Sequence, residues 1–241
     1  MTTPTKFWDK IADKYAQQPI ADEAAYQRKL ETTRRYLTPE SDVLEIGCGT
    51  GGTARMHAPY VRSVRATDYS PSMISIARDR LWESSLHNVT LEVAAAEDVR
   101  APDESYDAIL ALSILHLVLD RQAVLRRVVR MLKPGGFLVT STVCARDMSG
   151  IIPRILLPLG SALRILPHVK SLRAAEIRAD ILAMGLEVVE DWQSDSDKSL
   201  FLIARKPEGQ SISSPDMSTY AEPVTRTPLM ASGGPKTSTF A

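Results

Sequence analysis

Cysteine is scarce in this chain, which excludes a disulfide framework. The two residues, Cys48 and Cys144, also lack the spacing of a zinc site. No stretch approaches the roughly 20 uninterrupted apolar residues of a membrane-spanning helix. Residues 1–15 carry charges every few positions and contain no apolar core of a secretory signal. These absences together predict a cytoplasmic protein.

An excess of charge of either sign is also missing. Lysine plus arginine equals aspartate plus glutamate, at 29 each. No global field therefore draws the protein to nucleic acid, and we expect no nucleic-acid partner. Histidine and acidic residues form no cluster at metal-ligand spacing near the site described below, so no metal is expected.

Short apolar runs alternate with helical patterns along most of the chain. Strands are expected at residues 43–46, 63–68, 89–94, 106–112 and 137–143. Intervening helices imply an α/β fold, with a doubly wound, mostly parallel sheet covered on both faces. Two further runs, 186–192 and 200–205, predict an antiparallel hairpin at the end of a seven-stranded sheet.

The pattern also divides the chain into segments. Residues 1–40 read as an N-terminal helical lid, residues 41–206 as the ligand-binding domain with an apolar cap insertion at about 150–170, and residues 207–241 as a tail. The tail is rich in Pro, Ser, Thr and Gly, and we expect it to be disordered.

A glycine-rich turn follows the first strand, and it matches G-x-G-x-x-G through Gly47, Gly49 and Gly52. Such a turn brings the backbone and a helix N-terminus close to a ligand, which is either a dinucleotide or a methyl donor. Glu45 distinguishes the two, because its carboxylate would repel a pyrophosphate but suits the ammonium and sulfonium charges of S-adenosylmethionine.

Four motifs then resemble the class I, Rossmann-like, S-adenosylmethionine-dependent methyltransferases. They are VLEIGCGTGG at 43–52, a strand ending in Asp68, YDAILALSILHLV at 106–118 and LKPGG at 132–136. Within the class, the chain is most similar to the branch of ubiquinone and menaquinone C-methyltransferases. The resemblance implies methyl transfer by direct displacement to a small-molecule acceptor, with S-adenosylhomocysteine as the product.

The resemblance also implies which residues bind the cofactor. The methionine end would lie at Glu45 and the turn, and Asp68 would bind the ribose hydroxyls, in agreement with its spacing of 21 positions from Gly47. Helix capping is the other interpretation of Asp68, and core packing that of Met73. The expected cofactor-binding set is Glu45, Gly47, Cys48, Gly49, Thr50, Gly51, Asp68, Tyr69, Met73, Ala96, Glu97 and Ser113.

One position departs from the family pattern. Relatives place an acidic residue after the third strand to accept from the adenine amino group, and Ala95 aligns there. Glu97, Asp98 or backbone groups near Ala96 are the alternatives for this contact.

His116 and Tyr15 are the candidates for catalysis. His116 follows the fourth strand, where a neutral imidazole could deprotonate an acceptor, and the alternative is a hydrogen-bonded packing residue. Tyr15 and Tyr26 resemble lid residues of relatives, and lid packing is the alternative for Tyr26.

The apolar segment 151–170 has three interpretations. It covers a partly apolar acceptor pocket, forms a homodimer face, or makes a peripheral membrane contact through Arg154 and Arg164. Quinone-precursor or phospholipid methylation, an NAD-dependent oxidoreductase and a non-catalytic module that binds the methyl donor remain the alternative functions.

Overall fold

The computed structural model describes residues 4–148, 170–194 and 198–209. The chain divides into residues 1–210 and residues 211–241, and every described residue belongs to the first part. The apolar segment up to residue 169 and the tail beyond residue 209 lie outside the described residues. The roles that the sequence analysis gives to these two segments therefore stay predictions.

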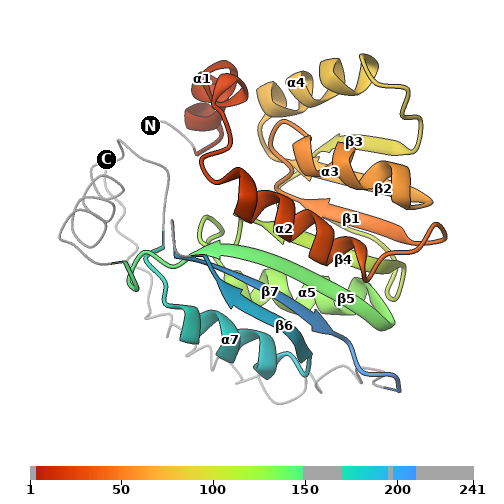
Figure 1. The fold of residues 1–241 in the computed structure, drawn as a ribbon, viewed down its shortest axis with the longest axis vertical. Coiled ribbons are helices and arrows are strands. Elements are labelled where there is room, and N and C mark those ends of the chain that lie inside the picture. The colour runs from red at the N-terminus through yellow and green to blue at the C-terminus, as the bar shows by residue number, and fades with distance from the viewer. Residues whose placement is uncertain (1–3, 149–169, 195–197, 210–241) are drawn as a thin grey trace, which may run out of the picture. The chain divides into compact units, whose positions relative to one another are not determined.

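Within the described residues, a seven-stranded sheet has the strand order β3-β2-β1-β4-β5-β7-β6 (Figure 1). The first five strands in this order are parallel, and β7 is antiparallel to both β5 and β6. The predicted doubly wound sheet with a terminal antiparallel hairpin is thus confirmed. The strands are β1 (Asp42–Ile46), β2 (Ser63–Asp68), β3 (Val89–Val93), β4 (Tyr106–Leu112), β5 (Leu132–Val143), β6 (Glu187–Gln193) and β7 (Ser199–Arg205).

Helices cover both faces of this sheet, as expected when parallel strands are buried on both sides. Ser70 caps the helix that begins at Pro71, because its Oγ accepts from the backbone N–H of Met73, as the sequence predicts. The helices are α1 (Pro4–Gln17), α2 (Glu23–Arg34), α3 (Gly52–His57), a 3₁₀ turn (Ala58–Tyr60), α4 (Pro71–Trp82), α5 (Arg121–Met131) and α7 (Ala174–Ala183).

Alternate residues of the central strands β1, β4 and β7 belong to two separate cores. Leu44 packs in the core that contains Ile177 of α7 and the apolar side of α5. Its neighbour Val43 packs in the other core, with Ala54 of α3 and Ile74 of α4. This period-two alternation fixes which face each side chain of a strand meets.

Strand β5 begins earlier than the sequence predicts, at Leu132 instead of Phe137. The backbone of Gly135 and Gly136 exchanges hydrogen bonds with that of Lys206, which follows β7. A Cβ on Gly136 would lie 2.9 Å from the Lys133 carbonyl oxygen, so only glycine allows the backbone to pass there. This contact near a distant strand lengthens β5 by residues that the sequence analysis leaves outside the predicted strand 137–143.

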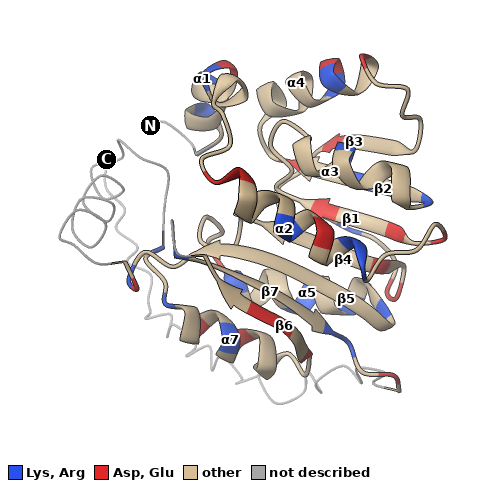
Figure 2. Cartoon of the chain, viewed as in Figure 1, with Lys and Arg blue, Asp and Glu red and all other residues tan. Residues whose placement is uncertain are grey.

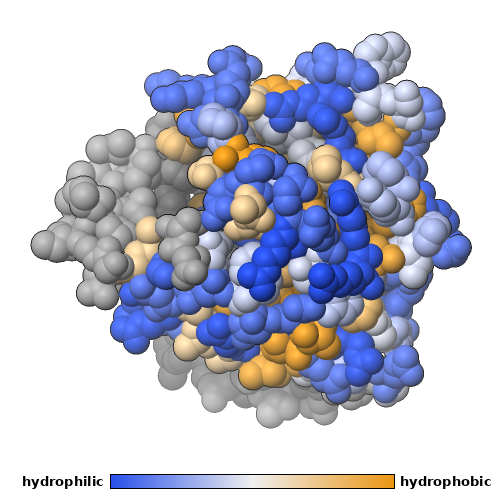
Figure 3. All heavy atoms as spheres, viewed as in Figure 1, coloured by the Kyte–Doolittle hydropathy of each residue, from blue (hydrophilic) through white to orange (hydrophobic). Residues whose placement is uncertain are grey.

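The surface carries both signs of charge, dispersed over helices and strands (Figure 2), and the face in view is mainly hydrophilic (Figure 3). This distribution agrees with the balanced composition. In the part of the chain that the structure describes, no helix has the length and apolar character needed to cross a membrane.

A buried histidine ends α3 on the side of the second core. The His57 side chain is almost fully enclosed, and its Nδ1 has no hydrogen-bond partner among the described residues. Burial, together with the nearby Arg34 charge, lowers the pKa of His57 to about 4. The folded protein therefore holds a neutral imidazole that would be protonated more readily in the unfolded chain.

This difference gives a pH dependence of stability. Because the pKa of His57 falls from 6.5 to about 4 on folding, the unfolded state binds more protons as the pH drops between these values. We expect His57 to lower the unfolding free energy by up to about 1.4 kcal/mol per pH unit across this window. Urea unfolding at several pH values gives the unfolding free energy as a function of pH. This free energy should change less steeply with pH for His57→Gln than for the wild type.

His87 provides the control for this experiment, because it is exposed and lies outside the core. His87→Gln should retain the wild-type slope. Equal slopes for the wild type and His57→Gln would exclude His57 as a source of acid sensitivity.

Candidate cofactor site

The strand order reverses between β1 and β4, and ligands of open α/β sheets bind at such a reversal, beyond the carboxyl ends of the strands. Strand β1 leads there into the glycine turn, and its neighbour β2 ends at Asp68. The fold therefore brings together the two carboxyl groups, Glu45 and Asp68, that the sequence analysis selects from separate motifs.

Three glycines of the turn have left-handed backbone conformations, with φ of 70° at Gly47, 53° at Gly49 and 73° at Gly51. A Cβ on Gly47 would lie 2.9 Å from the side chain of Ile114, and one on Gly51 would lie 3.0 Å from Cβ of Ala77. Backbone conformation and close packing thus both require glycine at these two positions. The turn is held between the segment after β4 and helix α4.

Asp68 holds this turn through its carboxylate. One oxygen accepts from the backbone N–H of Gly49 at 2.9 Å, and the other accepts from the backbone N–H of Ser70 at 2.9 Å. Burial raises the pKa of Asp68, and these two hydrogen bonds oppose the increase. Ser70, and not Asp68, makes the capping bond to α4. Asp68 is therefore a structural link between the two loops as well as the expected ribose ligand.

Glu45 lies deeper, with only 3% of its surface exposed. Its Oε2 is buried and has no hydrogen-bond partner among the described residues. Burial, and then the charge of Asp68, raise the pKa of Glu45 to about 8, with the backbone N–H of Ala54 acting in the opposite direction. A buried acceptor without a partner carries an energetic penalty that a cationic ligand group would relieve.

Helix α1 brings Tyr15 to the glycine turn. Its Cε1 lies 3.8 Å from the position of a Cβ on Gly49, and its ring meets Trp8 edge to face. Burial and the charges of Asp68 and Glu45 raise the pKa of Tyr15. The ring is nevertheless 44% exposed, so Tyr15 lies at the border between the turn and solvent. Tyr26 approaches the same turn, with its hydroxyl 4.0 Å from a Cβ on Gly52.

The residues expected near the adenine of the donor differ in burial and polarity. Burial, and then the charges of Asp68, Asp9 and Glu97, raise the pKa of Tyr69, which lies in the loop between β2 and α4. Glu97 accepts from the backbone N–H of Leu119 at 3.1 Å, so one of its oxygens is engaged in the protein. Met73 and Ala96 are buried, and Asp98 is exposed.

His116 and Ser113 follow β4 near the same edge. Burial lowers the pKa of His116 to about 4, and its Nδ1 has no partner among the described residues. The imidazole is neutral at pH 7 but is a weak base, which argues against efficient proton abstraction. Ser113 is exposed and has a φ of 56°, an uncommon conformation for serine, and its N–H donates to the carbonyl of Ser141 at 2.7 Å.

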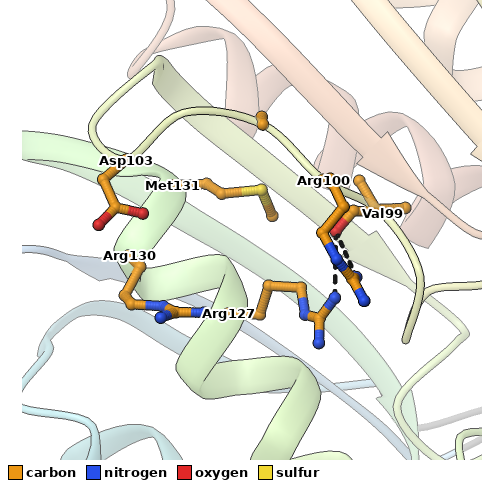
Figure 4. Close-up of a pocket in the computed structure, with 7 residues that line it drawn as sticks. Val99, Arg100, Asp103, Arg127, Arg130 and Met131 are labelled. Carbon is orange, nitrogen blue, oxygen red and sulfur yellow. Dashed lines mark hydrogen bonds between the residues drawn. The ribbon is translucent and has the colours of Figure 1, made fainter.

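A small hollow of about 80 Å³ lies elsewhere, against α5 and the segment before β4 (Figure 4). The residues around it precede the starts of β4 and β5, so it belongs to the amino ends of the strands. None of the expected cofactor residues lines it, and we assign it no part in the cofactor site. Its lining is Val99, Arg100, Ala101, Asp103, Arg127, Arg130 and Met131.

The described residues contain no group of three or more His, Cys, Asp or Glu side chains that could hold a metal ion.

Two polar residues at the site were not identified from the sequence. Asp9 of α1 accepts from Ser70 Oγ at 2.6 Å, and Arg80 of α4 donates to Thr50 Oγ1 at 2.7 Å. Neither residue belongs to a recognisable motif, since each acts across elements that are distant in sequence.

Comparison with known protein families gives one match in the sequence. Residues 44–140 match the family described as "Methyltransferase domain", from β1 into β5. The demethylmenaquinone methyltransferase of Tropheryma whipplei is 33% identical over 137 residues, which are 56% of each chain. The ubiquinone biosynthesis O-methyltransferase of Xanthomonas campestris is 36% identical over 110 residues, covering 45% of this chain and 46% of the relative. The chain thus spans about half the length of these relatives.

Solved structures share the fold at lower identity. The YcgJ protein of Bacillus subtilis has a TM-score of 0.64 and 22% identity, and the match covers 76% of this chain and all of that one. The [4+2]-cyclase SpnF has a TM-score of 0.71 and 20% identity, and the match covers 85% of this chain and 95% of that one.

The sheet order and the likeness to these solved structures define a Rossmann-like fold. The matched family region, residues 44–140, makes up less than half of the chain.

Asp68 should contribute to stability as well as to binding. Replacing it with Ala leaves the N–H groups of Gly49 and Ser70 without their acceptor, at a cost of about 1–3 kcal/mol in unfolding free energy. Urea unfolding measures this loss. The exposed Asp98→Ala is the control and should change stability by less than about 0.5 kcal/mol. Equal stabilities of the two variants would contradict a structural role for Asp68.

Proposed function

We propose that this protein is an S-adenosylmethionine-dependent methyltransferase that acts on a small-molecule acceptor. The observation that carries this proposal is the pair of buried carboxyl groups at the glycine turn. Glu45, one of the pair, has an oxygen without a hydrogen-bond partner in the part of the chain that the structure describes. A donor with ammonium and sulfonium charges complements such a pair. The methyltransferase domain and the names of the relatives support the same conclusion.

The residues present fit this cofactor better than a nicotinamide dinucleotide. A pyrophosphate at the turn would face Glu45 and Asp68, and in the described residues neither of these groups forms an ion pair with a Lys or Arg. With the donor bound, Glu45 would accept from its ammonium group and Asp68 from its ribose hydroxyls. The N–H groups of the turn would bind the carboxylate end of the methionine part.

When bound, S-adenosylmethionine supplies a methyl group that its sulfonium charge already activates. The work of the protein is then to hold donor and acceptor in line and to exclude water, and such positioning can lower a barrier by roughly 7 to 11 kcal/mol. Tyr15 covers the turn from α1. The low basicity of His116 favours positioning, and not proton abstraction, as its role.

The acceptor that we propose is partly apolar. Relatives named for demethylmenaquinone and ubiquinone biosynthesis make a quinone precursor one candidate, and a phospholipid is another. The segment 151–169, proposed to cover the acceptor, lies outside the described residues, as do the alternatives of a dimer face or membrane contact at that segment.

A protein that binds the donor without methyl transfer is the second candidate. The [4+2]-cyclase SpnF has the same fold, so the fold by itself does not specify the reaction. Release of S-adenosylhomocysteine in the presence of an acceptor separates this candidate from a methyltransferase.

Titration calorimetry tests the central proposal. We expect one S-adenosylmethionine per chain and no competition by NAD, because a cation stabilises the ionised form of Glu45, whereas a pyrophosphate gains no favourable charge interaction from this carboxyl group. A panel of thiols, phenols, quinone precursors, amines and fatty acids should then contain a compound that gains one methyl group. Tight NAD binding, or no binding of S-adenosylmethionine, would exclude the proposed cofactor.

Donor binding should also release a proton. With a pKa of about 8, most Glu45 side chains are protonated at pH 7, and a cation beside the carboxylate lowers that pKa. Binding at pH 7 should therefore release up to one proton, and affinity should rise as the pH increases from 7 toward 8. Calorimetry in two buffers of different ionisation enthalpy measures the proton.

Glu45→Gln is the matched variant for this test, because it preserves the shape of the side chain and cannot ionise. It should bind the donor more weakly and with no buffer dependence from this site. A buffer dependence equal to that of the wild type would assign the proton to another group.

A further inference from the structure

We propose that Arg80 is a positioning residue that couples helix α1 to the glycine turn, so that the position of α1 and the affinity for the donor change together. This inference rests on the proposed function. Arg80 lies in α4, outside the methyltransferase motifs identified in the sequence, and its guanidinium group bonds to two other elements. One nitrogen donates to Thr50 Oγ1 at 2.7 Å, and the other donates to the carbonyl of Ala16 at 2.6 Å.

The packing of α4 places Arg80 at the turn. Ala77, one helical turn earlier, contacts Gly51 so closely that a Cβ on that glycine would lie 3.0 Å from the alanine Cβ. Residues three apart lie on the same face of a helix, so the contact that brings Ala77 to the turn also directs Arg80 toward it. The position of Arg80 follows from the same close approach that requires glycine at residue 51.

The bond to Ala16 joins Arg80 to the end of α1. Ala16 lies in the last turn of that helix, where backbone carbonyls lack partners within the helix and a positive charge is favourable. Tyr15, the neighbour of Ala16, lies over Gly49. Fixing the Ala16 carbonyl therefore restrains the residue that covers the proposed donor site.

Asp9 holds α1 near the middle of the helix through two further hydrogen bonds. Asp9 accepts from Ser70 Oγ at 2.6 Å and from the backbone N–H of Ser72 at 3.2 Å, at the N-terminus of α4. An acidic group is favourable at that helix end. Each helix thus supplies a charged side chain to an end of the other, and both contacts involve a loop expected to bind the donor.

Arg80→Ala removes both bonds and provides the test. In the protein without donor, hydrogen exchange of the α1 amides should become faster than in the wild type. With donor, the dissociation constant should rise about tenfold, the usual order for losing charge-assisted hydrogen bonds. Arg80→Lys keeps the charge without the two-pronged geometry, and it should give intermediate values for both measurements.

Arg78→Ala is the matched control, because Arg78 is exposed on the same helix. It should leave exchange and donor affinity at wild-type values. Thr50→Val separates the two bonds of Arg80, since it removes the acceptor in the turn and leaves the Ala16 carbonyl. If Arg80 couples the two elements, this variant should also accelerate exchange in α1, although its substitution lies in the turn.

Three results would overturn the inference. The first is an α1 exchange rate in Arg80→Ala equal to that of the wild type. The second is faster α1 exchange in Arg80→Ala with an unchanged donor dissociation constant. The third is an α1 exchange rate in Thr50→Val equal to that of the wild type. Failure of the wild type to bind S-adenosylmethionine would overturn the proposed function instead. The exchange measurements without donor would still test whether Arg80 restrains α1. Should Arg80→Ala fail to fold, Arg80→Lys and Thr50→Val supply the same comparisons.

Discussion

The proposed donor site depends on the burial of Glu45 and Asp68 next to each other at one turn. Two carboxyl groups withdrawn from water at short range resist ionisation, and the pKa of each is raised. Asp68 recovers part of that cost through the N–H groups of Gly49 and Ser70, whereas one oxygen of Glu45 has no such partner among the described residues. A ligand that brings positive charge to Glu45 would complete the arrangement, and the proposed function rests on this complementarity.

Local sequence patterns predict most of the fold because the elements that they favour are also the ones that long-range packing stabilises. The strand ending at Ile46, the glycine turn and the capped start of α4 all appear where the sequence places them. Strand β5 shows where this fails, since Leu132 pairs with Tyr106 of β4, and Gly135 and Gly136 bond to Lys206, about 70 positions further along the chain. The local Pro-Gly-Gly sequence gives no sign of a strand, and these distant partners add it to β5.

The same reasoning applies to the site. Glu45, Asp68 and the glycines belong to motifs that each lie within a few residues, and the fold brings the motifs together. Asp9 and Arg80 have no local signature, because their role depends on two helices meeting side by side. The basicity of His116 also could not be read from its position in the sequence, since burial by distant side chains lowers its pKa.

These observations link the stability of the turn to its proposed chemistry. Asp68 is both a structural acceptor for Gly49 and the expected ribose ligand, so donor hydroxyls must share its oxygens with backbone groups already bound there. A carboxylate has room for about four hydrogen bonds, which permits this sharing without breaking the turn. Glu45 differs, because its Oε2, which has no partner among the described residues, is available only to a group that enters the buried site. Under the proposed function, Asp68 would keep the turn in its binding conformation before the donor arrives, and Glu45 would contribute most of the change in charge interaction on binding.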